Sequence, residues 1–296
     1  MKKLFIICFL MILFGCSESD DIRFMIPKGN PELASIYLND SDEYTLDLVN
    51  GPDPLVAAFG SSSHDVIVAP LTLGTKFFNA KEEYQLLGVM TWGNYYLVSE
   101  KSLDLEDLMN QKVYVFGQNQ VSDILMRVMN EHYELNLSFE YLDSLASAAA
   151  HILLHPEDYV LISDTSYSQV MMSNSSLQGL NLDDLYDDIT SNPLPQAGVF
   201  VKADMSDQAI RDIKESLIES INHLKNDTDQ AILYCESQGI TWSKDILEHI
   251  FSSNQLFWMD AEDARSSIEI LLNYVLMYQP LMISSKLPND QFYIGD

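Results

Sequence analysis

Short, continuously apolar segments bounded by turn residues recur along the first part of the chain. The clearest is the run Asp-Val-Ile-Val-Ala at residues 65–69, which follows Ser63-His64 and ends at Pro70. A run of this length without polar alternation is typical of a strand buried on both faces of a parallel sheet. Because such strands alternate with short helical segments, the pattern predicts an α/β sheet. Its other expected elements are strands at 22–26 and 44–49 and helices at 31–38 and 55–60.

The same alternation starts again after Tyr84 and indicates a second α/β unit. Two strands, 85–90 and 95–99, are separated by the polar turn Thr91-Trp92-Gly93-Asn94. The chain therefore predicts two α/β units joined by two crossing segments and followed by a helical tail. The remaining expected elements are strands at 112–116, 137–141, 159–162 and 197–201, and helices at 103–109, 122–132, 144–154, 207–224, 228–237, 242–252 and 261–277.

The N-terminal pattern is different and predicts an export signal. A basic start, Met1-Lys2-Lys3, precedes an uncharged run over residues 4–14, which is about half the length needed to span a bilayer. Gly15-Cys16 then stands where the chain turns from apolar to acidic, and this resembles the bacterial lipoprotein cleavage site. The resemblance implies a signal peptide at 1–15, lipidation (palmitate) of Cys16 and a tether at 16–20. An ordinary secretory signal with a chance cysteine is the alternative.

Charge excludes several classes of partner. Removing residues 1–15 takes two lysines from the 16 basic residues and none of the 44 acids, so the formal charge goes from −28 to −30. Such a surface repels phosphate backbones and anionic lipid head groups, which excludes nucleic acid and leaves membrane attachment to the lipid anchor. With Cys16 lipidated, Cys235 is left without a partner and no disulfide is expected.

Several segments carry, in order, a resemblance to one family. They are Leu55-Val56-Ala57-Ala58-Phe59, the stretch from Ser63 to Pro70, Leu105-Glu106-Asp107-Leu108 with Gln111-Lys112-Val113, Tyr141-Leu142-Asp143-Ser144, and the stretch from Leu287 to Tyr293. Together with the signal segment, they look like a solute-binding protein of an ABC importer. The similarity is to the class serving sulfonates, nitrate, taurine and thiamine-pyrimidine precursors. His64 ahead of Asp65, and Asn110-Gln111 in place of a usual glycine, depart from that pattern.

The resemblance implies a two-lobed, type II periplasmic-binding-protein-like fold that closes over a small organic solute. Lobe one is expected at 21–97 plus 199–296 and lobe two at 98–198. The implied protein is a monomeric, lipid-anchored and extracytoplasmic binding protein that delivers its solute to an ABC permease and its ATPase. Two alternatives remain open: an enzyme on the same fold, of the thiamine-pyrimidine or menaquinone-pathway type, and a surface ligand sensor or interaction lipoprotein without transport.

Candidate ligand-binding residues lie where strands turn into helices, because ligands of open α/β sheets sit beyond the carboxyl ends of the strands. Gly117 allows close approach of the backbone, and the amides of residues 118–122 could face an anionic group at a helix N-terminus. A simple tight turn, with Ser122 as the helix cap, is the alternative there. The candidates from these segments are Asn30, Leu71, Thr72, Gly117, Gln118, Asn119 and Asp164.

Two of the candidates imply particular chemistry. Trp92, in a polar turn beside the first crossing, is expected to stack on a flat or apolar ligand. Asp164 could accept a hydrogen bond from an amine or amidine, or else cap a helix or turn. Because cationic groups are scarce near these segments, the sequence favours a neutral or cationic heterocycle or a singly charged sulfonate over a doubly charged phosphonate.

Catalytic and metal-binding motifs are missing from the sequence. There is no His-Glu-x-x-His pattern, no Gly-x-Ser-x-Gly elbow and no phosphate-cradling glycine loop. His151 and His155 have helical i, i+4 spacing, but no third ligand lies nearby in sequence. We therefore expect no catalytic residues, no metal site and no cofactor.

Overall fold

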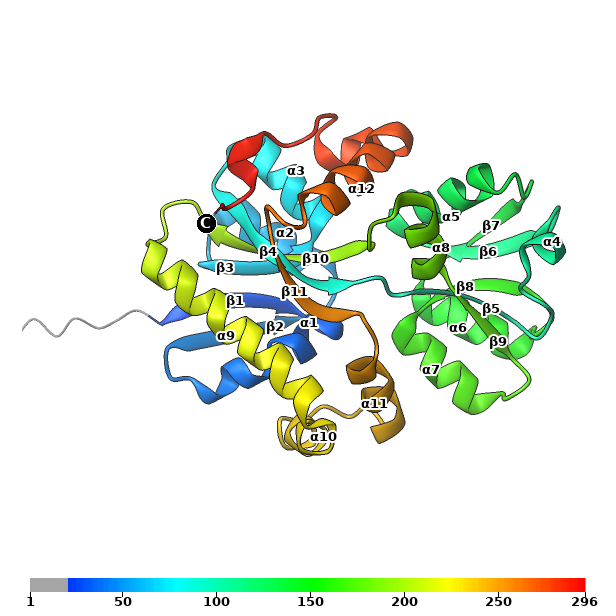
Figure 1. The fold of residues 1–296 in the computed structure, drawn as a ribbon, viewed down its shortest axis with the longest axis horizontal. Coiled ribbons are helices and arrows are strands. Elements are labelled where there is room, and N and C mark those ends of the chain that lie inside the picture. The colour runs from blue at the N-terminus through cyan, green and yellow to red at the C-terminus, as the bar shows by residue number, and fades with distance from the viewer. Residues whose placement is uncertain (1–20, 296) are drawn as a thin grey trace, which may run out of the picture.

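Two separate β-sheets divide the chain into a larger and a smaller lobe (Figure 1). The structure is a computed structural model and describes residues 21–295. The larger lobe holds a six-stranded sheet of order β11-β4-β10-β3-β1-β2, and the smaller lobe a five-stranded sheet of order β7-β6-β8-β5-β9. The expected signal peptide, the tether and Cys16 lie outside the described residues. Among residues 21–295, no helix is long and apolar enough to cross a membrane.

The larger lobe is a sheet with helices on both faces. Its strands β1, β2 and β3 are parallel, while β10 runs antiparallel between β3 and β4. Helices α2, α3 and α12 pack on one face and α1, α9, α10 and α11 on the other. The strands are Ile22–Pro27, Tyr44–Val49, Val66–Pro70, Tyr84–Trp92, Pro195–Lys202 and Leu256–Asp260 (β1–β4, β10 and β11), and the helices Asn30–Ala34, Pro52–Ser61, Leu71–Lys81, Asp207–Asn226, Thr228–Ser237, Lys244–Ser252 and Arg265–Tyr278 (α1–α3 and α9–α12).

The smaller lobe repeats this plan. Strands β6, β7 and β8 are parallel, and β5 runs antiparallel between β8 and β9. The continuously apolar β8 is buried at every residue, as its sequence pattern predicts. The strands are Tyr95–Ser99, Lys112–Phe116, Ser138–Leu142, Tyr159–Ser163 and Gln178–Asn181 (β5–β9), and the helices Leu105–Leu108, Val121–His132, Leu145–Leu154, Asp164–Ser173 and Leu182–Thr190 (α4–α8).

The two crossings lie earlier than the sequence suggests. One runs from β4 to β5 through Gly93 and Asn94, and the other leads from α8 into β10. They lie side by side, because the amide of Gly93 donates to the carbonyl oxygen of Leu194 at 2.8 Å. The expected boundaries 97/98 and 198/199 therefore fall inside β5 and β10. Each strand stays whole because it pairs along its length with neighbours in its own sheet.

Three local expectations are corrected. The helix expected over 31–38 ends at Ala34 and continues as the 3₁₀ helix Ile36–Asp40. Trp92 is the last residue of β4 and does not lie in the turn. Strand β11 was not expected; it forms because β4 offers an antiparallel partner. The four helices of the tail start and end within a few residues of their expected positions.

Packing on glycines yields a stability prediction with an internal control. A Cβ atom on Gly74 of α3 would lie 2.0 Å from the Phe200 ring, whereas one on the exposed Gly60 of α2 would meet nothing within 4 Å. Gly74→Ala should therefore lower the free energy of unfolding by about 1–3 kcal/mol through overpacking. Gly60→Ala should raise it by up to about 1 kcal/mol, because alanine favours the helix. Urea unfolding measures both changes, and equal effects at the two sites would contradict the packing described.

Candidate ligand-binding cleft

A cleft of about 440 Å³ lies between the lobes where the strands of both sheets end. A side chamber of about 260 Å³ adjoins it and shares four of its lining residues. The main chamber is lined by Pro27, Lys28, Gly29, Asn30, Pro31, Gly51, Pro52, Leu55, Pro70, Thr91, Trp92, Asn94, Gln120, Leu145, Ser163, Thr165, Gln196 and Ala197. The side chamber adds Leu71, Thr72, Leu73, Tyr95, Val121, Pro195, Leu271 and Met282.

The larger lobe contributes three strand-to-helix turns to this cleft. They follow β1, β2 and β3, whose parallel carboxyl ends meet at one edge of the sheet. Each of the helices α1 and α2 has a proline in its first turn, which suits the fixed φ of that residue. The sequence-predicted candidates Asn30, Leu71 and Thr72 come from these turns, and all three line the cleft or its side chamber.

Asn30 is the most constrained polar residue of the lining. It is 7% exposed, and its side-chain nitrogen donates to Oε1 of Gln255 at 3.3 Å. Among the described residues its Oδ1 atom has no hydrogen-bond partner, and Nε2 of Gln196 on β10 makes no well-formed hydrogen bond, although the Gln196 side chain lies beside the Tyr95 hydroxyl. Buried polar atoms are nearly always paired, so two open ones in one cleft mark places for ligand or water. Gln196 was not among the sequence candidates, and its position beside the second crossing is the signal that could have identified it.

The cleft lining is nearly free of charge. Among its residues Lys28 is the only charged one, and no aspartate, glutamate, histidine or cysteine is present. Acids make up 44 of the 296 residues, so a lining of this size would ordinarily contain several. The cleft therefore offers no counter-ion to a cationic ligand.

Trp92 forms a wall and is held rigidly. Its ring stacks on Phe257 of β11 with centroids 4.6 Å apart, and its indole nitrogen donates to the carbonyl oxygen of Phe257 at 2.9 Å. It is 2% exposed and lines both the cleft and a second cavity of about 550 Å³, whose lining also includes Asp183 and Phe257. The expected place of Trp92 beside the cleft agrees with the structure, and its contact with a ligand stays a prediction.

Of the predicted segment around Gly117, the candidates Gly117, Gln118 and Asn119 do not line the cleft, whereas the neighbouring Gln120 and Val121 do. The amide of Asn119 donates to the Asp123 carboxylate at 2.9 Å and that of Gln120 to the Gly117 carbonyl, so neither is free for an anion. Gly117 has φ +73° and is closely approached by Ser122, which fits the tight-turn alternative. Ser122 is not the cap; its hydroxyl donates to the Phe116 carbonyl at 2.8 Å. Gln118 is exposed, and Asn119 accepts a hydrogen bond from Gln279 of the larger lobe at 2.6 Å.

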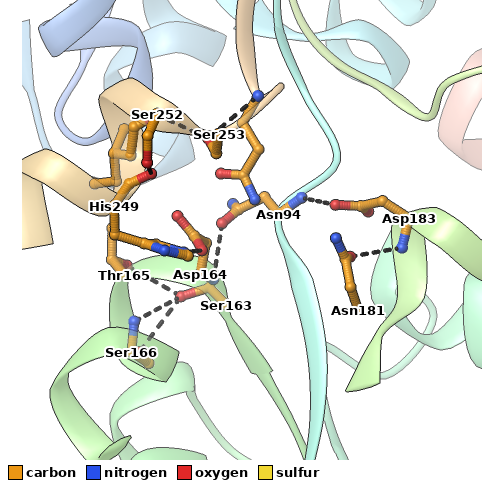
Figure 2. A network of polar contacts seen from close by, with 12 residues as sticks. Asn94, Ser163, Asp164, Thr165, Ser166, Asn181, Asp183, His249, Ser252 and Ser253 are labelled. Atoms are coloured by element: carbon orange, nitrogen blue, oxygen red, sulfur yellow. Dashed lines mark hydrogen bonds and ion pairs between the residues drawn. The ribbon is translucent and has the colours of Figure 1, made fainter. Parts of the chain in front are cut away.

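Asp164 also lies away from the cleft lining and instead joins the lobes (Figure 2). It is fully buried at the start of α7, and its Oδ1 is 2.8 Å from Nε2 of His249 on α11 of the larger lobe. Asp164 was expected to bind an amine or amidine of the ligand; in the structure it binds the His249 side chain instead. His249 lies 85 residues further along the chain, so no local sequence pattern indicates that the two residues pair.

Asn94 connects this pair to a second buried carboxylate. Its amide donates to Oδ2 of Asp183 at 2.9 Å, and its side-chain oxygen accepts from the amide of Asp164 at 3.0 Å (Figure 2). Burial raises the pKa of Asp183 to about 7. The hydrogen bond with Asp164 raises the pKa of His249 above its usual value. The first crossing is thus held by the Asp183 carboxylate and by the backbone amide of Asp164, whose side chain pairs with His249.

No three His, Cys, Asp or Glu side chains come together as a metal site within residues 21–295. His151, one of the pair at helical spacing, bonds Asp158 at 2.8 Å on the smaller lobe, away from the cleft.

Comparison with known structures defines the fold class. An ABC transporter protein from Parabacteroides distasonis has a TM-score of 0.81 at 20% identity, over 93% of this chain and 99% of that chain. The periplasmic aliphatic sulphonate binding protein SsuA from Escherichia coli has 0.72 at 16%, over 93% and 92%. The alkanesulfonate-binding protein SsuA from Xanthomonas axonopodis pv. citri, bound to MOPS, has 0.62 at 17%, over 91% and 94%. The expected two-lobed periplasmic-binding-protein fold is confirmed.

Sequence comparison identifies the family. The model of the menaquinone biosynthesis family matches residues 61–269. This match spans more than half of the chain, so the protein belongs to the menaquinone biosynthesis family. No curated protein matches the sequence.

The two titrating groups at the crossing make stability depend on pH. Both pKa values are higher than in the unfolded chain, so each group stabilises the fold at low pH and loses that contribution as pH rises through its folded pKa. For Asp183 the loss falls between about pH 4 and pH 7, and for His249 above about pH 6.5, at up to about 1.4 kcal/mol per pH unit for each group. Asp183→Asn should make the free energy of unfolding less dependent on pH in the lower range, and His249→Gln should do so in the upper range. Urea unfolding from pH 4.5 to 8.5 measures both effects.

The exposed Asp188 on the same helix provides the control. Asp188→Asn makes the same change of charge and should keep the wild-type slope. A slope for Asp183→Asn parallel to that of the wild type would show that Asp183 ionises normally in the folded protein.

Proposed function

We propose that this protein is an extracytoplasmic solute-binding protein that holds a small organic solute between its lobes and delivers it to an ABC permease with its ATPase. The observation that carries this proposal is the cleft lining, which is apolar and amide-rich and contains no carboxylate, imidazole or thiol. Such a lining can orient and desolvate a ligand, as small-molecule sites do. The two sulfonate-binding proteins described above share the fold of this chain and support the same proposal.

An enzyme of menaquinone biosynthesis is the second candidate, and the family match over residues 61–269 favours it. General acid–base catalysis needs a titratable group within hydrogen-bond reach of the reacting atoms. Lys28 and Tyr95 are the only side chains of an ionisable type in the cleft lining, and burial raises the pKa of Tyr95 to about 12. The lining thus supports binding over proton-transfer chemistry.

The lining supports a narrower class of solute than the sequence does. Asp164 was the expected partner of a cationic heterocycle, but it pairs with His249 and lies outside the cleft lining. A cationic heterocycle is therefore disfavoured. A neutral heterocycle and a singly charged sulfonate remain, the latter with Lys28 as its partner. Lys28 is exposed and forms no ion pair among the described residues that could compete.

The proposal is tested by native mass spectrometry of the full-length protein, purified in detergent from its own host without refolding. A bound small organic molecule that is recovered unchanged after prolonged incubation is the expected result. Conversion of that molecule during incubation would favour the enzyme. A protein of apo mass that neither binds nor converts any compound of a metabolite panel would contradict both candidates and favour a surface interaction protein.

Attachment to the membrane is part of the proposal and has its own test. Cys16 is proposed to carry the lipid, because Gly15-Cys16 follows an apolar segment typical of an export signal. Labelled palmitate should be incorporated by the wild type and not by Cys16→Ala. Cys235→Ala provides the control, since this cysteine is fully buried and should not affect labelling. Export of an unlabelled wild-type protein would favour the ordinary secretory signal.

A further inference from the structure

Two open amide atoms in the cleft have opposite hydrogen-bonding character. Oδ1 of Asn30 can only accept a hydrogen bond, and Nε2 of Gln196 can only donate one. Both residues line the main chamber, and Gln196 also lines the side chamber. We propose that the cleft binds an uncharged secondary amide, such as a lactam or pyrimidinone, whose N–H donates to Asn30 and whose carbonyl accepts from Gln196. This inference rests on the proposed binding function and specifies its ligand class.

The acceptor character of Asn30 is imposed by its neighbour. Gln255 is 5% exposed, and its Oε1 accepts a hydrogen bond from the side-chain nitrogen of Asn30. The side-chain oxygen of Asn30 therefore points away from Gln255. Gln255 is itself fixed at the entrance to β11, because its carbonyl oxygen accepts from the amide of Trp92 at 2.8 Å. An oxygen held in this way faces a ligand as an acceptor. The oxygens of a sulfonate could not satisfy it, since they also only accept.

The donor position is held by the second crossing. Gln196 lies between Pro195 and Ala197 on β10, and the amide of Ala197 is fixed by the Thr91 hydroxyl at 3.1 Å. The Gln196 side chain lies where the main and side chambers meet, beside the Tyr95 hydroxyl. Its amide nitrogen carries two N–H groups, so contact with Tyr95 leaves one for a ligand. An N–H beside a carbonyl is the simplest neutral group that satisfies one acceptor and one donor at once.

The side chamber gives the ligand a second feature. Its walls include Leu71, Tyr95, Leu271 and Met282, and it holds no charged side chain. An apolar substituent next to the amide would be removed from water there and would add to the binding free energy. The favoured ligand is thus a secondary amide with an alkyl or aryl group of modest size.

Matched ligand pairs on the wild-type protein provide the test. We would measure by calorimetry the affinities of a panel of alkyl- and aryl-substituted lactams and pyrimidinones, each beside its N-methylated counterpart, and of alkanesulfonates of similar length. N-methylation removes the donor and leaves a buried acceptor without a partner, so affinity should fall about 10-fold or more. The sulfonates should bind more weakly than the matched amides.

Variants assign the effect to the named residues. Asn30→Leu should abolish the difference between each amide and its N-methylated partner, and Gln196→Glu should weaken all amides by replacing the donor with an acceptor. If Asn30→Leu does not fold, Gln196→Leu tests the donor by itself at a half-buried position. It should weaken the N–H compounds and their N-methylated partners alike and leave the ratio of their affinities unchanged. The control is Gln169→Glu, which makes the same change of charge at an exposed position of α7 outside the cleft lining and should leave affinity unchanged.

The outcomes separate this inference from the proposed function. Equal affinities for N–H and N-methyl compounds would mean that water satisfies the two amides, and this would overturn the inference. Tight binding of sulfonates with weak binding of amides would overturn it as well, while leaving the binding function intact. Failure of every compound, together with an apo protein in native mass spectrometry, would remove the inference and the binding function together.

Discussion

The buried carboxylate of Asp164 governs how the two lobes meet. A charge placed out of contact with water is costly unless it is paired, and Asp164 is fully buried in the smaller lobe. Its partner, His249, comes from the larger lobe, so any motion that separates these helices leaves the carboxylate without a partner. On another face, Asn119 and Gln279 join the lobes by a hydrogen bond between neutral side chains. The relative position of the lobes, and with it the shape of the cleft, depends on these contacts.

One segment of the chain connects this lobe contact to the cleft. Helix α11 carries His249, and the residues that follow it, Gln255 and Phe257, hold Asn30 and Trp92 in place. Because the segment is short, a shift of α11 relative to the smaller lobe would also move Asn30 and Trp92, which line the cleft. The reverse follows by thermodynamic linkage: a ligand that favours one position of Asn30 or Trp92 also favours one position of α11.

The sequence predicts the two α/β units and most of their elements because their strands are apolar runs bounded by turns, which is a local signal. It does not predict β11, whose five residues follow a helix without alternation and become a strand only through pairing with β4. The candidate site divides in the same way. Asn30, Leu71 and Thr72 follow from the rule that ligands lie at the carboxyl ends of strands. Gln196 and the Asp164–His249 pair depend on contacts between distant segments, which no local pattern records.

The contrast between surface and cleft bears on which solutes the protein can capture. With a formal charge of −28, the molecule repels anions at a distance and attracts cations. A cation needs a negatively charged partner in the cleft, and the lining contains no acid. An anion would have to approach through a repulsive field and would find only Lys28. A neutral ligand is not repelled by the surface and needs no counter-ion, so its association rate should be insensitive to ionic strength. The association rate of a sulfonate should rise with salt, because salt screens the surface charge. The charge distribution thus favours neutral solutes on kinetic grounds that are independent of the hydrogen-bonding argument at Asn30 and Gln196.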